Sequence, residues 1–295
     1  MRIGPDTAPN WTPYLWSVKW ATPIIKGEKS IAALRNNIRH TLNLSVLQGR
    51  WWWNDPDCVM VRDYDTTLNN NEVLSNLSLV GLSGGLMISS DDLTRLSPER
   101  QKLVGLLTPL LGQAGRPLDL LEREMAELYV LPVSKPWGEW HDAAIFNWED
   151  RPADRKLDLC RLGYTPGEKL HIFDFWQQKY WTAPAGEIEL GKVPAHGCRL
   201  LRICRAEDKP VLVGDTLHIT QGCEIDRWSV PGKTLQIETI DLGRKAQGEL
   251  WLWLPGKLAT VNSGLRQLPI EKVNGDVYRL ELEFQGRADI TITWE

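Results

Sequence analysis

From about residue 126 to the end of the sequence, the chain consists of short runs in which apolar and polar residues alternate. Runs such as LQIETI, YRLELEF and DITITW place every second side chain on one face of a strand. Gly, Pro, Asp and Asn separate these runs, as expected for turns between strands. The pattern predicts an antiparallel β-sandwich region over residues 118–295, with one sandwich or two sub-modules at about 118–206 and 207–295.

Residues 1–117 follow a different pattern, in which short strand-like runs alternate with helical ones. The runs RIG, RWWWN and GGLMIS are predicted strands, and helices are predicted over residues 27–47, 69–83 and 97–111. Asn69 and Ser97 are predicted N-caps of the second and third helix. The order β-α-β-α-β-α predicts a parallel sheet with covering helices, joined to the β region by a linker at residues 112–120.

Composition excludes some classes of partner. The chain has 34 Lys and Arg against 38 Asp and Glu, a net charge of -4, which argues against nucleic acid. No run approaches the roughly 18 apolar residues of a membrane-spanning helix, so no membrane partner is expected. The five cysteines are scattered without a CxxC pair, which favours free thiols in a reducing compartment and therefore a cytoplasmic location.

No metal or other cofactor is expected from the histidine and cysteine spacing. Five such residues fall within 28 positions, namely His196, Cys198, Cys204, His218 and Cys223. They lack the close pairs of zinc sites, and cysteines in strands usually act as small buried apolar residues. His141 and His171 are predicted to be core or edge residues of the sandwich.

Carboxylates and amides gather where the predicted strands of residues 1–117 end. These are Asp6 after the first run, with Arg2 within it, then Asn54, Asp55, Asp57 and Cys58, and then residues 89–92. In a (β/α) barrel, catalytic groups occupy this end of the strands. A carboxyl pair at such a place is what glycoside hydrolysis requires, although Asp-Pro and Pro-Asp also form ordinary turns.

An acid role for Asp6 needs a raised pKa, because Arg2 stands four residues away and favours the ionised carboxylate. Either partial burial or a nearby negative group would raise that pKa, and the surrounding prolines and tryptophans are candidates for the burial. The chain has fifteen tryptophans and only four phenylalanines. Indole faces pack well against sugar rings, although for any single tryptophan a place in the core is the more common role.

Four segments together resemble the α-galactosidases of glycoside hydrolase family 36. WWWNDPDCVMVRD resembles their NDPDC segment and the NDPDM segment of family 27, and MRIGPDTAPNW is similar to the preceding barrel strand. SGGLMISSDDLTRLSPER resembles the last barrel strand and helix, and the segments from AAIFNW to HGCRLLRI resemble the C-terminal sandwich. The resemblance implies an α/β part plus an all-β part: a partial (β/α)8 TIM barrel of about three βα units, then a C-terminal antiparallel β-sandwich region.

The resemblance also implies roles for single residues. Asp6 matches the general acid/base, and Arg2 matches an arginine that binds a sugar hydroxyl near the reacting carbon. Asp57 and Cys58 match the lining of the galactosyl subsite, with Trp53 as a further substrate contact. Asp55 braces that loop, and Asp91 and Asp92 cap the last barrel loop.

The family's nucleophile is an aspartate in a Lys-x-Asp context on an earlier barrel strand, and no such segment precedes Asp6. The resemblance therefore implies a C-terminal portion of a retaining α-galactosidase that acts on α-galactoside oligosaccharides and is inactive alone. A separately encoded N-terminal half or a second copy of the chain is the expected partner, because a barrel slice leaves strand edges unpaired.

Two alternatives remain open from the sequence. The first is a related enzyme, either a galactosyltransferase of the raffinose-synthase kind or an α-N-acetylgalactosaminidase. The second is a carbohydrate-binding or structural β module without catalytic activity.

Overall fold

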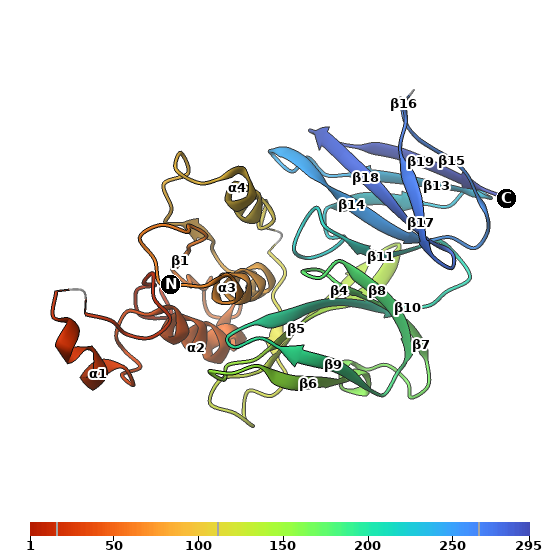
Figure 1. The fold of residues 1–295 in the computed structure, drawn as a ribbon. Coiled ribbons are helices and arrows are strands. Elements are labelled where there is room, and N and C mark those ends of the chain that lie inside the picture. The colour runs from red at the N-terminus through yellow and green to blue at the C-terminus, as the bar shows by residue number, and fades with distance from the viewer. Residues whose placement is uncertain (16, 111, 265) are drawn as a thin grey trace. The chain divides into compact units, whose positions relative to one another are not determined.

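The computed structural model describes residues 1–15, 17–110, 112–264 and 266–295 (Figure 1). The chain divides into two compact units. Unit 1 comprises residues 1–131, 143–156 and 189–199, and unit 2 comprises residues 132–142, 157–188 and 200–295. The domain boundary near residue 117 that the sequence indicates stays a prediction.

Three of the four helices of unit 1 lie within the ranges that the sequence predicts. The four are α1 (Thr22–Ile25), α2 (Leu34–Leu44), α3 (Asn70–Ser83) and α4 (Pro98–Gly105), with 3-10 turns at Lys19–Ala21 and Ser45–Leu47. The sequence does not predict α1, and α4 ends at Gly105, before the predicted end at residue 111, which lies outside the described residues. A capping box starts α3: the Asn69 side chain accepts the Glu72 N–H at 3.1 Å, and Glu72 accepts the Asn69 N–H at 2.9 Å. Ser97 Oγ accepts the Arg100 N–H at the start of α4.

The first predicted helix is shorter than expected, because Ala33 is extended and α2 begins only at Leu34. None of the helices in the described residues is long and apolar enough to span a membrane.

Parallel pairing in unit 1 is short. Strands β1 (Cys58–Val59) and β2 (Ile88–Ser89), joined by α3, pair in parallel, and Arg2 forms a parallel bridge with Asp55. The predicted strand RWWWN is wrong: at Gly49 the backbone has a positive φ and turns back, so that Trp52 bridges Gln48. This local turn overrides the β propensity of the tryptophans. Within the described residues the full pattern of a partial barrel is not shown and stays a prediction.

The middle of the chain forms antiparallel strands. A six-stranded sheet has the order β3-β4-β5-β10-β7-β8, and β6 and β9 form a separate pair. The bounds are β3 (Arg116–Pro117), β4 (Leu128–Lys135), β5 (Gly138–Phe146), β6 (Ala153–Asp158), β7 (Lys169–Asp174), β8 (Lys179–Pro184), β9 (Glu187–Val193) and β10 (Cys198–Arg205), with a 3-10 turn at Leu159–Leu162.

The last part of unit 2 is a β-sandwich, as the alternating pattern predicts. One sheet has the order β11-β14-β18-β17 and the other β12-β13-β19-β15-β16. The bounds are β11 (Val211–Asp215), β12 (Ile225–Ser229), β13 (Thr234–Thr239), β14 (Lys245–Trp253), β15 (Leu258–Ser263), β16 (Arg266–Gln267), β17 (Ile270–Asn274), β18 (Val277–Gln285) and β19 (Asp289–Trp294).

One apolar core joins the two sheets of the sandwich. Leu250 and Leu280 come from the first sheet, and Ile237 and Ile292 come from the second. In β13 and β19 every second residue is buried, so the alternation in the sequence matches the inward and outward faces of the strands.

Candidate functional site

Two of the predicted carboxylates meet on one arginine in unit 1. Arg2 Nη2 lies 2.8 Å from Asp6 Oδ1 and 2.7 Å from Asp57 Oδ2. The Asp6 side chain is 84% exposed, whereas that of Asp57 is only 18% exposed. The site thus combines one accessible carboxylate, one shielded carboxylate and a cation that contacts both.

The Asp57 carboxylate is held by its own loop. Asp57 adopts a left-handed backbone conformation, with φ of 72°, and its N–H donates to Asp55 Oδ1 at 2.8 Å. The Asp55 side chain thus forms an Asx turn with Asp57, and aspartate is one of the few non-glycine residues that adopt a left-handed conformation readily. The Asp57 carboxylate in turn accepts the Thr7 N–H at 2.5 Å, so the loops that carry Asp6 and Asp57 are joined directly.

Backbone contacts bring the two loops side by side. The Ile3 N–H donates to the Asp55 carbonyl at 3.1 Å, and the Asp55 N–H donates to the Met1 carbonyl at 2.8 Å. Asn37 on α2 also contacts both loops: its side-chain amide donates to the Pro56 carbonyl at 2.7 Å and to the Pro5 carbonyl at 3.5 Å. Asn37 is 1% exposed, so one buried amide supports the residues directly before both aspartates.

The sequence interpretation missed Asn37 and Thr7 as parts of the site. The sequence does contain an indication for Asn37. Asparagine is a poor helix former, so an Asn-Asn pair in the middle of a predicted helix indicates that at least one of the two side chains makes a specific contact. Nothing in the sequence marks Thr7, which acts through its backbone N–H.

Replacing Asn37 with alanine is expected to lower the free energy of unfolding by about 1–3 kcal/mol, because two carbonyls lose a buried donor. Asn43 on the same helix is exposed, so Asn43→Ala is the matched control and is expected to change stability by about 0.5 kcal/mol or less. Urea unfolding of both variants measures the difference. Equal stability of the two variants would contradict a supporting role for Asn37.

Cys58 begins β1 directly after Asp57 and is buried. Burial and the neighbouring Asp57 carboxylate both raise the pKa of the Cys58 thiol. The thiol therefore stays protonated at neutral pH, which fits a lining residue and not a nucleophile.

Burial of Asp6 by prolines and tryptophans, which the sequence suggested, is wrong. The ion pair with Arg2 directs the carboxylate to the surface, where it is 84% exposed. The other expected feature, a nearby negative group, is present in Asp57, which shares the Arg2 nitrogen with Asp6.

Trp53 and the two aspartates after β2 lie in different settings. Trp53 is 58% exposed, and its carbonyl accepts the Met1 amino group at 2.5 Å, which places its backbone beside the residue that precedes Arg2. The Asp91 side chain is fully buried and accepts the Val61 N–H at 2.6 Å. Asp92 is bound by the Thr94 hydroxyl and N–H, and these hydrogen bonds lower its pKa.

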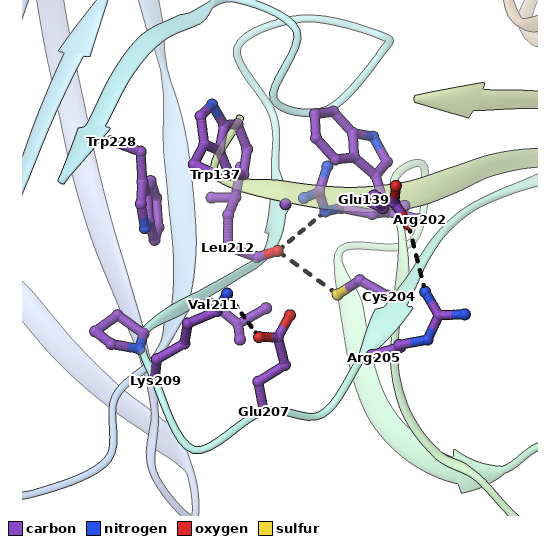
Figure 2. Close-up of a pocket in the computed structure, with 13 residues that line it drawn as sticks. Trp137, Glu139, Arg202, Cys204, Arg205, Glu207, Lys209, Val211, Leu212 and Trp228 are labelled. Atoms are coloured by element: carbon purple, nitrogen blue, oxygen red, sulfur yellow. Dashed lines mark hydrogen bonds and ion pairs between the residues drawn. The ribbon is translucent and has the colours of Figure 1, made fainter. Parts of the chain in front are cut away.

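A cavity in unit 2 is lined by tryptophans but is too small for a sugar (Figure 2). Trp137 stacks between Trp140 and Trp228, with ring centroids 5.0 and 5.1 Å apart, and the Arg202 guanidinium lies 4.0 Å from the Trp140 ring. The cavity volume of about 20 Å³ holds roughly one water molecule. Trp140 is buried, and Trp137 and Trp228 are partly buried against the apolar core of the sandwich.

Among the described residues, no group of three or more His, Cys, Asp or Glu side chains is arranged to hold a metal ion. Of the five cysteines, all of which are free thiols, Cys58, Cys204 and Cys223 are buried.

No protein-family model matches the chain. Its fold is similar to that of alpha-galactosidase I from Mortierella vinacea, with a TM-score of 0.52 at 15% identity over 70% of this chain and 54% of that one. A putative alpha-galactosidase from Bacteroides fragilis has a TM-score of 0.51 at 16% identity, over 70% and 42% of the two chains. The Saccharomyces cerevisiae alpha-galactosidase solved with raffinose has a TM-score of 0.50 at 11% identity, over 69% and 59%.

The chain therefore has an α-galactosidase-like fold. It spans about half the length of these solved structures. At such identities the similarity concerns the fold, and the chemistry has to be argued from the residues of this chain.

Proposed function

We propose that this chain supplies the acid/base side of a glycoside hydrolase active site that releases α-linked galactose from oligosaccharides. The observation that carries the proposal is the placement of Asp6 and Asp57 on one Arg2 nitrogen. The α-galactosidase-like fold supports it, together with the sequence resemblance of the same segments.

Asp6 is the general acid/base in this proposal. It protonates the glycosidic oxygen as the bond to the sugar breaks, and it later takes a proton from the water that releases the sugar. Exposed ion pairs contribute only about 0.2–1 kcal/mol, so Asp6 can leave Arg2 and reach a substrate at little cost. Its exposure leaves the carboxylate accessible to a glycosidic oxygen.

Arg2 and Asp57 bind the sugar in this proposal. Arg2 offers five N–H donors in a fixed plane, and Asp57 is an acceptor whose position the Thr7 N–H holds. The half-buried Asp57 accepts one sugar hydroxyl while Arg2 donates to its neighbour, so that two adjacent hydroxyls are bound as a pair. The exposed Trp53 offers an apolar face to the ring.

Binding of methyl α-D-galactopyranoside, followed by ligand-detected NMR, tests this site. Arg2→Ala and Asp57→Asn are each expected to weaken binding near Trp53 about tenfold, because each removes a hydrogen bond to a sugar hydroxyl. Arg95→Ala is the control, since Arg95 is half exposed and pairs with Asp65. Unchanged affinity at this site in both Arg2→Ala and Asp57→Asn would contradict the proposal.

The purified chain is expected to release no nitrophenol from a nitrophenyl α-galactoside, because the resemblance assigns no nucleophile to it. Turnover by the chain alone, persisting in Asp6→Asn, would overturn the assignment of Asp6 as the acid/base.

A further inference from the structure

A second cavity lies within unit 2 and shares no residue with the Arg2 cluster, which consists of Arg2, Asp6 and Asp57. It is bounded by the β7–β8 hairpin, the end of β14 and the turn between β17 and β18, elements labelled in Figure 1. Its volume is about 240 Å³. This is slightly below the range of about 300–1,000 Å³ typical for drug-sized ligands, so a ligand of a single small ring fits. The residues used in the argument are Lys169, His171, Tyr180, Thr182, Trp253 and Asp276.

His171 lines this cavity and carries one unsatisfied polar atom. The residue is only 2% exposed, and its Nδ1 lies 2.7 Å from the Tyr180 hydroxyl. Its Nε2 is buried and has no hydrogen-bond partner within the described part of the chain. Because buried polar atoms are nearly always paired, this nitrogen calls for a partner that the chain does not supply, either a water molecule or a polar group of a ligand.

The charge state of His171 determines which kind of group can hydrogen-bond to Nε2. Burial lowers the pKa of His171 to about 4, and burial raises the pKa of Tyr180 to about 12. Both groups are therefore neutral at physiological pH, and the imidazole offers one donor and one acceptor. A neutral hydroxyl, which can serve either nitrogen role, matches Nε2 in both tautomers.

The rest of the lining combines aromatic faces with an exposed polar rim. The rings of Trp253 and Tyr180 are half-buried, and each lies about 6 Å from the His171 ring, at 6.1 and 5.8 Å between centroids. Thr182, Lys169 and Asp276 are exposed, and Asp276 also forms a salt bridge with Lys272 at 3.8 Å. The charges at the rim are thus solvated, whereas the rings nearest His171 are uncharged, which favours an uncharged ligand that has both apolar faces and hydroxyls.

Two aromatic side chains that line the cavity pack against a small buried apolar cluster. Phe173 in β7 packs with Val213, Trp251 and Val277 in a small buried cluster, and Tyr180 and Trp253 pack against it. The aromatic walls are thus held in place before a ligand arrives, which lowers the entropic cost of binding.

We propose that this cavity binds one neutral pyranose ring, with His171 Nε2 hydrogen-bonded to a ring hydroxyl and Trp253 against the apolar face of the sugar. The site is a binding site and not a catalytic one. It holds a saccharide independently of the Arg2 cluster.

The ring nitrogens of His171 report on this site directly. In the full chain, titration with methyl α-D-galactopyranoside or methyl α-D-glucopyranoside is expected to shift the His171 ¹⁵N resonance of Nε2. Thr182→Val and Asp276→Ala, both at exposed positions, are each expected to weaken the binding seen by this signal about tenfold. Thr291→Val, on an exposed position of β19, is the matched control and leaves the affinity unchanged.

The outcomes separate this site from the Arg2 cluster. The His171 shift persists with unchanged affinity in Arg2→Ala and in Asp57→Asn, so failure of the proposed hydrolase site leaves this test intact. Unchanged sugar affinity in both Thr182→Val and Asp276→Ala, or no His171 shift at saturating sugar, would overturn the proposal. A shift produced by sulfate at lower concentration than by either sugar would also overturn it, because the cavity would then be an anion site.

Discussion

Replacing Arg202 with leucine is expected to lower the free energy of unfolding by about 3–5 kcal/mol, the effect of removing one partner from a buried charged network. Arg202 is 1% exposed and its guanidinium lies over the Trp140 ring. It donates to the carbonyls of Leu212 and Gln221, so the change leaves two buried acceptors without their donor.

Three buried carboxyls explain why the charge of Arg202 matters. Asp142, Asp215 and Glu224 are fully buried, and burial raises the pKa of each, while the charge of Arg202 opposes that rise. Because these groups bind protons more tightly in the folded chain than in the unfolded chain, their contribution to stability falls as pH rises above about 4. Without Arg202 this fall is expected to be steeper.

Arg205 provides the control on the same strand, β10. Its side chain is 44% exposed and pairs with Glu168 and Glu139, so Arg205→Leu is expected to cost about 1 kcal/mol or less. Urea unfolding of both variants at pH 5 and pH 8 gives the comparison. A loss below about 1 kcal/mol for Arg202→Leu at both pH values would contradict the role of Arg202 in this network.

His196→Asn is expected to lower the free energy of unfolding by about 2–3 kcal/mol at pH 6, through lost charge-assisted hydrogen bonds. His196 Nδ1 lies 2.7 Å from Glu72 on α3, and Nε2 lies 2.9 Å from Asp150. The ring also stacks on Trp11, with 4.3 Å between centroids. Asparagine suits the test because it tolerates the positive φ of 56° at this position.

The effect of His196 depends on pH with a defined sign. Burial disfavours the charged ring, but the hydrogen bonds to Glu72 and Asp150 outweigh it and raise the pKa of His196 above 6.5. The stabilisation is therefore complete below the unfolded-state pKa of about 6.5 and is lost as pH rises through the higher folded-state pKa.

The loss caused by His196→Asn should accordingly be largest near pH 6 and smaller at pH 9. His196→Gln, which can donate one hydrogen bond without charge, should show a weaker dependence on pH. Thermal unfolding at several pH values measures both variants. An equal loss at pH 6 and pH 9 would show that packing on Trp11, and not the charge, is what His196 contributes.

Local features of this protein were readable from the sequence. The caps at Asn69 and Ser97 and the burial alternation of β13 and β19 match the prediction. These depend on neighbours within a few residues, where backbone geometry and side-chain period leave little freedom. The Arg2–Asp6 pair, four residues apart, belongs to the same class of local contact.

The tertiary structure decided everything that depends on distant segments. It brought Asp57 to Arg2, placed Asn37 against both aspartate loops and joined His196 to Glu72, 124 residues away. It also left Asp6 exposed and buried three carboxyls around Arg202. Residue types and spacing by themselves do not encode these outcomes, because which segments meet depends on how the whole chain packs its apolar surface.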